Sequence, residues 1–300
     1  MAHDHTHQID NYNRAFAIGI GLNITFVIIE VVYGTIADSM ALLADAGHNL
    51  SDVVSLVLAW GASVLAAKST TSKRTYGLRK ATVMASLVSA VILLVALGGI
   101  AWEAFSRFTD PRPVAGMTVM VVAAIGVVIN TVTALLFVKG QHNDLNIKGA
   151  FLHMAADAAV SLGVVIGGVI IFKTGWLWVD PLISIAIVGV IFFGTWGLLK
   201  DSLNYAMDAV PDKIDMPDIN EFLRAQERVE RIHDLHVWPL STTEVALTVH
   251  LVVRDEHIDN TFLHKLQEDL LHDFGIDHAT FQIESISGEN LCMLDKHTSC

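Results

Sequence analysis

Six apolar stretches, each long enough to cross a lipid bilayer, constrain the fold of this chain more than any other feature. About 20 helical residues, at ~1.5 Å each, span a hydrocarbon core of ~30 Å. Charged or turn-rich segments such as 68–80 and Asp110–Pro113 separate the stretches. The predicted spans are residues 14–36, 40–67, 81–105, 116–138, 147–172 and 178–200. With 53% hydrophobic residues, the composition agrees with a polytopic helical membrane protein.

The basic residues of the connecting loops predict the orientation. Segment 68–80 carries five Lys or Arg and no acid, segment 139–148 carries two, and the opposite loops are poorer. Because cytoplasmic loops are enriched in Lys and Arg, both termini are expected in the cytoplasm. The polar, His-containing tail of residues 1–13 and the length of the first span indicate no cleavable signal peptide.

A soluble domain is predicted after the spans, because the composition changes near Pro211. Residues 1–208 carry 12 Lys or Arg and 13 Asp or Glu, whereas residues 209–300 carry 7 and 18. The acidic half argues against nucleic-acid binding. Residue patterns predict a helix over 216–230, strands over 232–238 and 244–253, a helix over 259–274 and a strand over 278–284. This αββαβ order predicts a small α+β domain at 209–290, behind a membrane domain at 14–208 and before a flexible tail at 291–300.

One four-residue spacing occurs twice inside the apolar stretches. His48 and Asp52 lie in the second span, and His153 and Asp157 lie in the fifth. Residues i and i+4 of a helix share one face, so each span presents an imidazole beside a carboxylate. An ionisable side chain at this depth costs roughly 2.5–3.5 kcal/mol, so four of them need a partner. Two imidazoles and two carboxylates suit a tetrahedral divalent metal, zinc above all, which predicts transport of such a metal across the bilayer.

The two pairs are expected to meet near the bilayer midplane. The first lies about ten residues below the outer end of its span and the second about eight above the inner end of its own, depths that add to roughly 27 Å. Antiparallel packing would set His48 beside Asp157 and Asp52 beside His153. Asp45, three positions before His48, is interpreted as a supporting residue rather than a fifth ligand.

Four segments of the chain resemble the cation diffusion facilitator family. They are Ser39–Asp52 (SMALLADAGHNLSD), Arg74–Gly77 (RTYG), Ala150–Asp157 (AFLHMAAD) and Asp180–Ser184 (DPLIS). The His-Asp/His-Asp set resembles the zinc-type branch, and the short segment 139–148 favours a bacterial member. The resemblance implies a homodimer in the bacterial inner membrane that exchanges zinc for protons, with a ferredoxin-like cytoplasmic domain that senses metal.

The resemblance also implies a second, cytoplasmic metal site. His233, His250, Gln282 and Glu284 occupy positions that supply ligands in some relatives, and His264 occupies the position of a bridging histidine. Gln282 is a weaker ligand than histidine, so a mononuclear and a binuclear site both stay open. The resemblance further suggests that Lys80 pairs with Asp208 at a dimer contact.

The function expected from the sequence is a secondary transporter, not an enzyme, that exports zinc from the cytoplasm by alternating access. Zinc is then the substrate and a potential regulator, and the proton is the counter-ion. Metal needs ionised carboxylate and neutral imidazole, so its binding displaces protons. Efflux of cadmium, cobalt or nickel by the same mechanism, or a membrane metal sensor without transport, are the alternatives.

Overall fold

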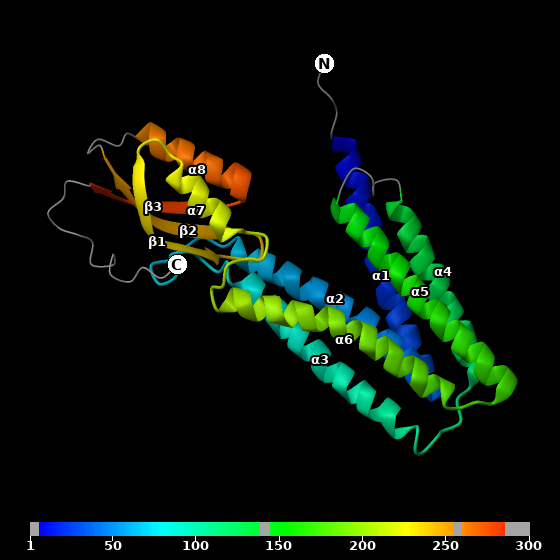
Figure 1. Ribbon diagram of the computed structural model, residues 1–300. Helices are drawn as coiled ribbons and strands as arrows, with labels where there is room; N and C mark the ends of the chain where they lie inside the picture. Colours follow the sequence, from blue (N-terminus) through cyan, green and yellow to red (C-terminus); the bar gives the residue numbers. More distant parts are fainter. Residues whose placement is uncertain (1–5, 139–144, 255–259, 286–300) are drawn as a thin grey trace. The chain divides into compact units, whose positions relative to one another are not determined.

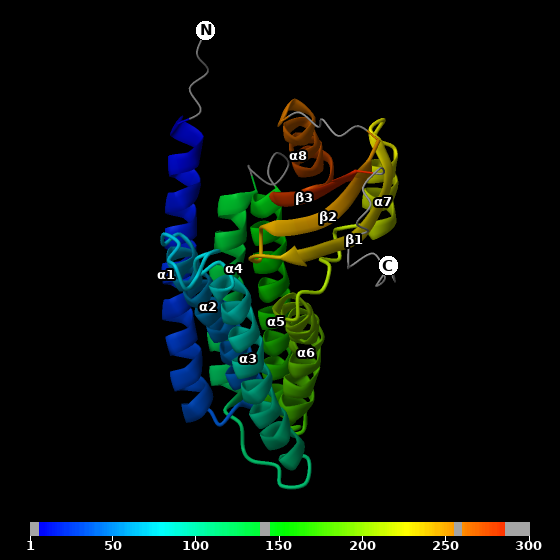
Figure 2. The ribbon, with the colours of Figure 1, turned by 90° about the vertical axis from the view of Figure 1, so that its left-hand side faces the viewer.

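A computed structural model describes residues 6–138, 145–254 and 260–285 (Figures 1 and 2). Six long helices occupy the predicted spans: α1 (Thr6–Ile36), α2 (Met40–Ala66), α3 (Ala81–Ser106), α4 (Gly116–Phe137), α5 (Leu145–Thr174) and α6 (Val179–Ala206). In the described residues, four helical segments have the length and apolar composition of a membrane span: Ala81–Ser106, Gly116–Leu136, Met154–Thr174 and Val179–Ala206. The chain is therefore a helical membrane protein, as predicted.

The chain divides into two compact units. Met1–Leu58 and Val88–Gly197 form the first unit, and Ala59–Leu87 and Leu198–Cys300 form the second. All six long helices contribute buried apolar side chains to the core of the first unit, among them Phe26, Leu42, Leu97, Val122, Val164 and Ile187. Many other large apolar side chains are exposed, as expected on a lipid-facing surface.

Small residues bring α4 and α5 into backbone contact in the first unit, where the two helices run side by side (Figure 2). A Cβ atom on Gly116 would lie 2.9 Å from the Phe172 amide nitrogen, and one on Gly168 would lie 2.8 Å from the Met120 nitrogen. Because such distances are shorter than van der Waals contact, only glycine allows this approach. The contact fixes α5, which carries His153 and Asp157, against α4.

Besides the ends of α2, α3 and α6, the second unit contains a three-stranded sheet and two further helices (Figure 1). Its elements are α7 (Met216–Arg224), β1 (Val229–Pro239), β2 (Val245–Val253), α8 (Asn260–Phe274) and β3 (His278–Ser285). The strand order is β1-β2-β3, with β1 antiparallel and β3 parallel to β2. The predicted αββαβ order is confirmed. The first helix ends earlier than predicted, at Arg224, because Val229 is buried and already pairs with Val253.

Alternation along the strands separates the two faces of the sheet. Leu247, Val249 and Leu251 of β2 belong to the apolar core that includes Leu223 of α7 and Leu270 of α8. Successive strand residues point to opposite faces. His250, between Val249 and Leu251, therefore points away from the helix-covered face. The same alternation places Glu284 of β3 on the face of His250.

Candidate metal centres

Three side chains of the predicted transport site meet between α2 and α5. His48 Nε2 lies 3.1 Å from Asp157 Oδ1, and His48 Nδ1 lies 4.0 Å from Asp52 Oδ2. One ligand atom from each of the three residues lies within 4.8 Å of the others. The pairing of His48 with Asp157 is the one that antiparallel packing of the two helices requires.

The donor set of this cluster suits a divalent transition metal. It offers one imidazole nitrogen and two carboxylates, whose charges balance those of a divalent cation. The Asp157 side chain is 2% exposed, whereas that of Asp52 is 36% exposed. His153 lies on α5 one turn before Asp157, but its side chain lies outside the described part, so its pairing with Asp52 stays a prediction.

A buried polar layer adjoins this cluster on one side. Ser161 Oγ donates to Asp45 Oδ2 (3.0 Å), and Asn49 Nδ2 donates to Glu30 Oε2 (3.1 Å). The interpretation of Asp45 as a supporting residue agrees with its bond to serine. Neither Ser161 nor Asn49 was predicted from the sequence. The signal for Ser161 was its position four residues after Asp157, on the same helical face.

Asp180 caps the first turn of α2 from the first turn of α6. Its carboxylate accepts hydrogen bonds from the Ser39 hydroxyl, the Met40 amide (2.7 Å) and the Ala41 amide (3.4 Å). The amides of a helix N-terminus lack intrahelical acceptors, and an anion there is stabilised by the helix dipole. This contact gives the DPLIS segment a structural role, because it anchors the helix that carries His48.

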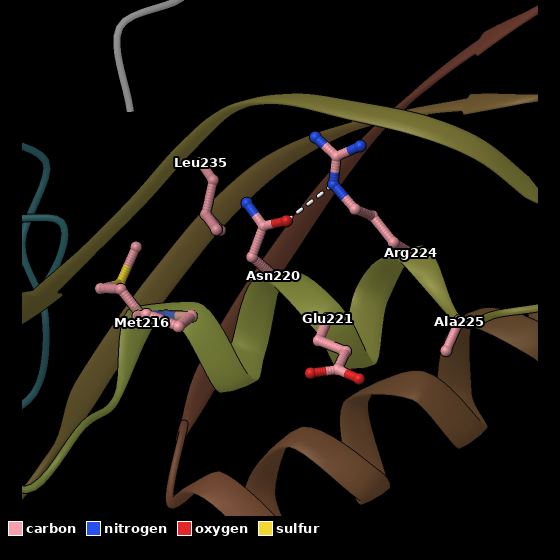
Figure 3. Close-up of a pocket in the computed structure, with 7 residues that line it drawn as sticks. Met216, Asn220, Glu221, Arg224, Ala225 and Leu235 are labelled. Atoms are coloured by element: carbon pink, nitrogen blue, oxygen red, sulfur yellow. Dashed lines mark hydrogen bonds between the residues drawn. The ribbon is translucent and has the colours of Figure 1, made fainter.

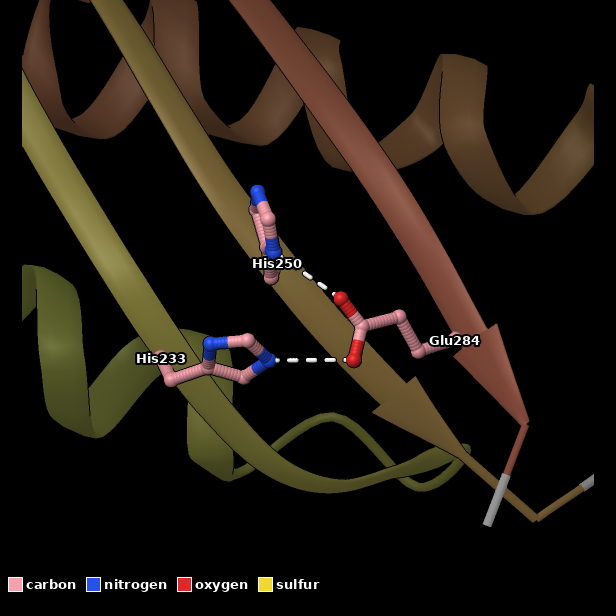
Figure 4. A group of neighbouring side chains, drawn as sticks. All are labelled: His233, His250 and Glu284. Atoms are coloured by element: carbon pink, nitrogen blue, oxygen red, sulfur yellow. Dashed lines mark hydrogen bonds and ion pairs between the residues drawn. The ribbon is translucent and has the colours of Figure 1, made fainter. Parts of the chain in front are cut away.

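A second cluster of potential ligands lies on the sheet of the second unit (Figure 4). His233 of β1 and His250 of β2 point toward Glu284 of β3. His233 Nε2 lies 3.1 Å from Glu284 Oε2, and His250 Nδ1 lies 2.8 Å from Glu284 Oε1. Both histidines are buried, with side chains 1% and 9% exposed. Two imidazoles on one carboxylate could hold a divalent metal, with further ligands from neighbouring groups.

The remaining predicted ligands contribute to this cluster unequally. Gln282 Nε2 donates to Glu284 Oε1 (3.1 Å), so Gln282 orients the carboxylate. His264 lies on α8, where it is 72% exposed and 3.5 Å from Glu268 Oε1, and it is not one of the atoms that gather at Glu284. Asp234 was not predicted from the sequence, and its Oδ2 lies 3.5 Å from His250 Nε2.

The predicted partner of Lys80 is found within the same chain. Lys80 Nζ donates to Asp208 Oδ1 (2.5 Å) and to the Tyr205 carbonyl (2.9 Å). Its neighbour Arg79 forms an ion pair with Glu244 at 3.1 Å. These contacts join the basic loop before α3 to the α+β part of the second unit, while the dimer contact stays a prediction.

A surface pocket beside α7 offers a contrasting chemistry (Figure 3). Met216, Asn220, Glu221, Arg224 and Leu235 are among its lining residues, and Arg224 Nε donates to Asn220 Oδ1 at 2.7 Å. Its lining includes one carboxylate and no imidazole or thiol. The two side-chain clusters are thus better candidates for metal than this pocket.

The fold and the clusters define a class: a helical membrane protein with a cluster of potential metal ligands between its spans and a second such cluster on an α+β domain. Residues 16–205 match the cation efflux transmembrane domain family, and residues 211–286 match the cation efflux protein cytoplasmic domain. The chain belongs to the cation efflux family of cation diffusion facilitators. It is accordingly a metal cation efflux transporter and not an enzyme, as predicted.

Curated relatives cover nearly the whole chain. The metal cation efflux system protein CzcD of Cupriavidus metallidurans is 37% identical over 94% of this chain and 89% of its own length. The zinc transporter ZitB of Escherichia coli is 35% identical over 95% and 93%, respectively. A cadmium, cobalt and zinc/H(+)-K(+) antiporter of Bacillus subtilis is 33% identical over 94% and 92%. The solved metal-bound C-terminal domain of the CzcD transporter is 33% identical, covers 24% of this chain and 99% of that domain, and gives a TM-score of 0.22.

Proposed function

We propose that the protein exports zinc from the cytoplasm in exchange for protons, by alternating access. His48, Asp52, His153 and Asp157 are the proposed transport ligands. The observation that carries the proposal is the convergence of His48, Asp52 and Asp157 within 4.8 Å between two long helices. The names of the zinc transporter and the antiporter among the relatives support zinc and proton exchange.

Competition for the same atoms provides the coupling. His48 Nε2 and Asp157 Oδ1 lie at hydrogen-bond distance, 3.1 Å, so a proton between them occupies the lone pairs that zinc would use. Zinc needs the neutral imidazole and the ionised carboxylates, and therefore releases that proton on binding. Protonation from the opposite side of the membrane returns the pair to its hydrogen-bonded state and releases the metal.

The nitrogen and oxygen atoms of this site can also bind related divalent metals, so the choice among these metals depends on the geometry of the site. Cadmium, cobalt and nickel are the alternative substrates, and relatives are named for the first two. The nitrogen of His48 favours borderline metals over hard cations such as magnesium.

Flux into proteoliposomes under a pH gradient tests this function. Zinc uptake should require the gradient, exceed uptake of cadmium, cobalt or nickel in competition, and disappear in Asp157→Ala. Asp201→Ala is the matched control, because Asp201 is an exposed acid of α6. Zinc flux in Asp157→Ala equal to that of the control would refute the site, and flux insensitive to pH would refute the antiport.

The cytoplasmic cluster is proposed as a regulatory site in a homodimer. His233, His250 and Glu284 would bind cytoplasmic zinc, with Gln282 holding the carboxylate. His264, which lies apart from this cluster on α8, is a candidate ligand for a second metal ion only. A soluble domain cannot itself move an ion across the bilayer, so this site would adjust the transport rate. The proposed location is the bacterial inner membrane, with both termini in the cytoplasm.

A further inference from the structure

A set of buried polar side chains outside the proposed ligands lies one helical turn from them. Asp45 precedes His48 by three positions on α2, and Ser161 follows Asp157 by four on α5. Ser161 Oγ donates to Asp45 Oδ2 at 3.0 Å, and both residues are fully buried. The two helices therefore carry successive rungs of one antiparallel ladder: Asp45 with Ser161, then His48 with Asp157.

A second cross-link joins α1 to this ladder. Asn49 Nδ2 donates to Glu30 Oε2 at 3.1 Å, and the two residues are 3% and 0% exposed. In the described chain, the other two oxygens, Glu30 Oε1 and Asp45 Oδ1, have no hydrogen-bond partner.

We propose that Asn49, Glu30, Asp45 and Ser161 are positioning residues, whose two hydrogen bonds set the register of α2 against α1 and α5. The inference rests on the proposed function of His48 and Asp157 as zinc ligands. The four residues do not bind the metal. They fix the distance between the ligands that do.

Register is critical because metal coordination tolerates little displacement. A slip of one residue moves a helix by ~1.5 Å, whereas ligand distances at a zinc site vary by about 0.2 Å. Loosening the ladder should therefore weaken zinc binding and penalise the larger cadmium ion less. Selectivity is thus a readout that separates positioning from general stability.

The first test removes one hydroxyl. Ser161→Ala should raise the zinc KM of proteoliposome flux about tenfold and lower the zinc-to-cadmium ratio. Ser184→Ala is the matched control, because Ser184 is equally buried in the first unit and its hydroxyl has no hydrogen-bond partner in the described chain. An unchanged KM and metal ratio in Ser161→Ala would overturn the inference. The proposed function would survive, because it depends on Asp157→Ala.

The second test concerns the bond that joins α1 to α2. Glu30→Gln keeps a side-chain oxygen that can accept from Asn49, so it should recover most of the zinc affinity that Glu30→Ala loses. If the two variants bind zinc equally well, this bond does not position the ligands, and the inference is wrong. Zinc binding measured in detergent, on protein that elutes as a folded species, separates this result from a failure to fold.

Discussion

Replacing Asp180 by alanine should destabilise the membrane part of the protein strongly. The side chain is 1% exposed and accepts bonds from Ser39, Met40 and Ala41 at the start of α2. Those three donor residues are themselves at most 4% exposed, so Asp180→Ala leaves buried donors without an acceptor. It also removes the negative charge that faces the positive end of the helix dipole.

The hydrogen-bond distances give the size of the expected loss in unfolding free energy. A hydrogen bond to a charged group contributes about 1.5–3 kcal/mol. The bond from the Met40 amide is short at 2.7 Å and counts fully, whereas that from the Ala41 amide, at 3.4 Å, counts little. With the Ser39 bond, the expected loss is roughly 3–5 kcal/mol. Asp180→Asn keeps one acceptor oxygen and should lose about 1–2 kcal/mol.

Thermal unfolding of the purified protein in detergent measures the effect. At 2–4 °C per kcal/mol, the midpoint of Asp180→Ala should fall by roughly 10 °C, and that of Asp180→Asn by less. Asp110→Ala is the control, because Asp110 is an exposed acid just after α3. Equal midpoints for Asp180→Ala and Asp110→Ala would show that the cap contributes nothing, and the reasoning would fail.

Three further predictions concern the metal clusters. Asp52→Ala should abolish zinc flux while the protein still elutes as a folded species, since one carboxylate then faces a divalent charge alone; retained flux would contradict its role. His48→Asp should shift preference from zinc toward cadmium or harder cations, because an oxygen replaces a borderline nitrogen; the zinc-to-cadmium ratio in competition flux measures this. The double variant His233→Ala/His250→Ala should keep transport but lose its activation by cytoplasmic zinc, whereas complete loss of flux would make the cytoplasmic site obligatory.

Much of the fold was predictable because the apolar residues of a membrane span, and the charged or turn residues that end it, follow one another in the sequence. The starts of α2 at Met40 and α3 at Ala81 agree with the predicted spans. The pairing of His48 with Asp157 followed from helical periodicity and antiparallel packing. By contrast, a serine such as Ser161 resembles any other small residue of a membrane helix. Its role depends on which faces of α2 and α5 meet, and sequence periodicity alone does not determine this.

The geometry of the second cluster, formed by His233, His250 and Glu284, was likewise only partly predictable from the sequence. Strand alternation predicts that His250 and Glu284 share a face, but not that Glu284 reaches both imidazoles. A register irregularity between His233 and His236 in β1, with Asp234 at φ 52°, turns the Asp234 carboxylate toward His250. Non-glycine residues rarely adopt this conformation, so local propensity gives no sign of it.

The two ends of the proposed transport cluster differ in how deeply their side chains are buried. At the end nearer the start of α2, the Asp45 and Ser161 rung is fully buried. At the other end, the Asp52 side chain is 36% exposed. Under the proposed orientation, α2 runs from the outer surface toward the cytoplasm, so the closed end faces outward and the open end faces inward. A metal ion would then enter past Asp52 and stop at the His48 and Asp157 rung, where the buried ladder blocks further passage. Release to the other side would then require α2 and α5 to separate at that ladder, where the bond between Asp45 and Ser161 holds the two helices together.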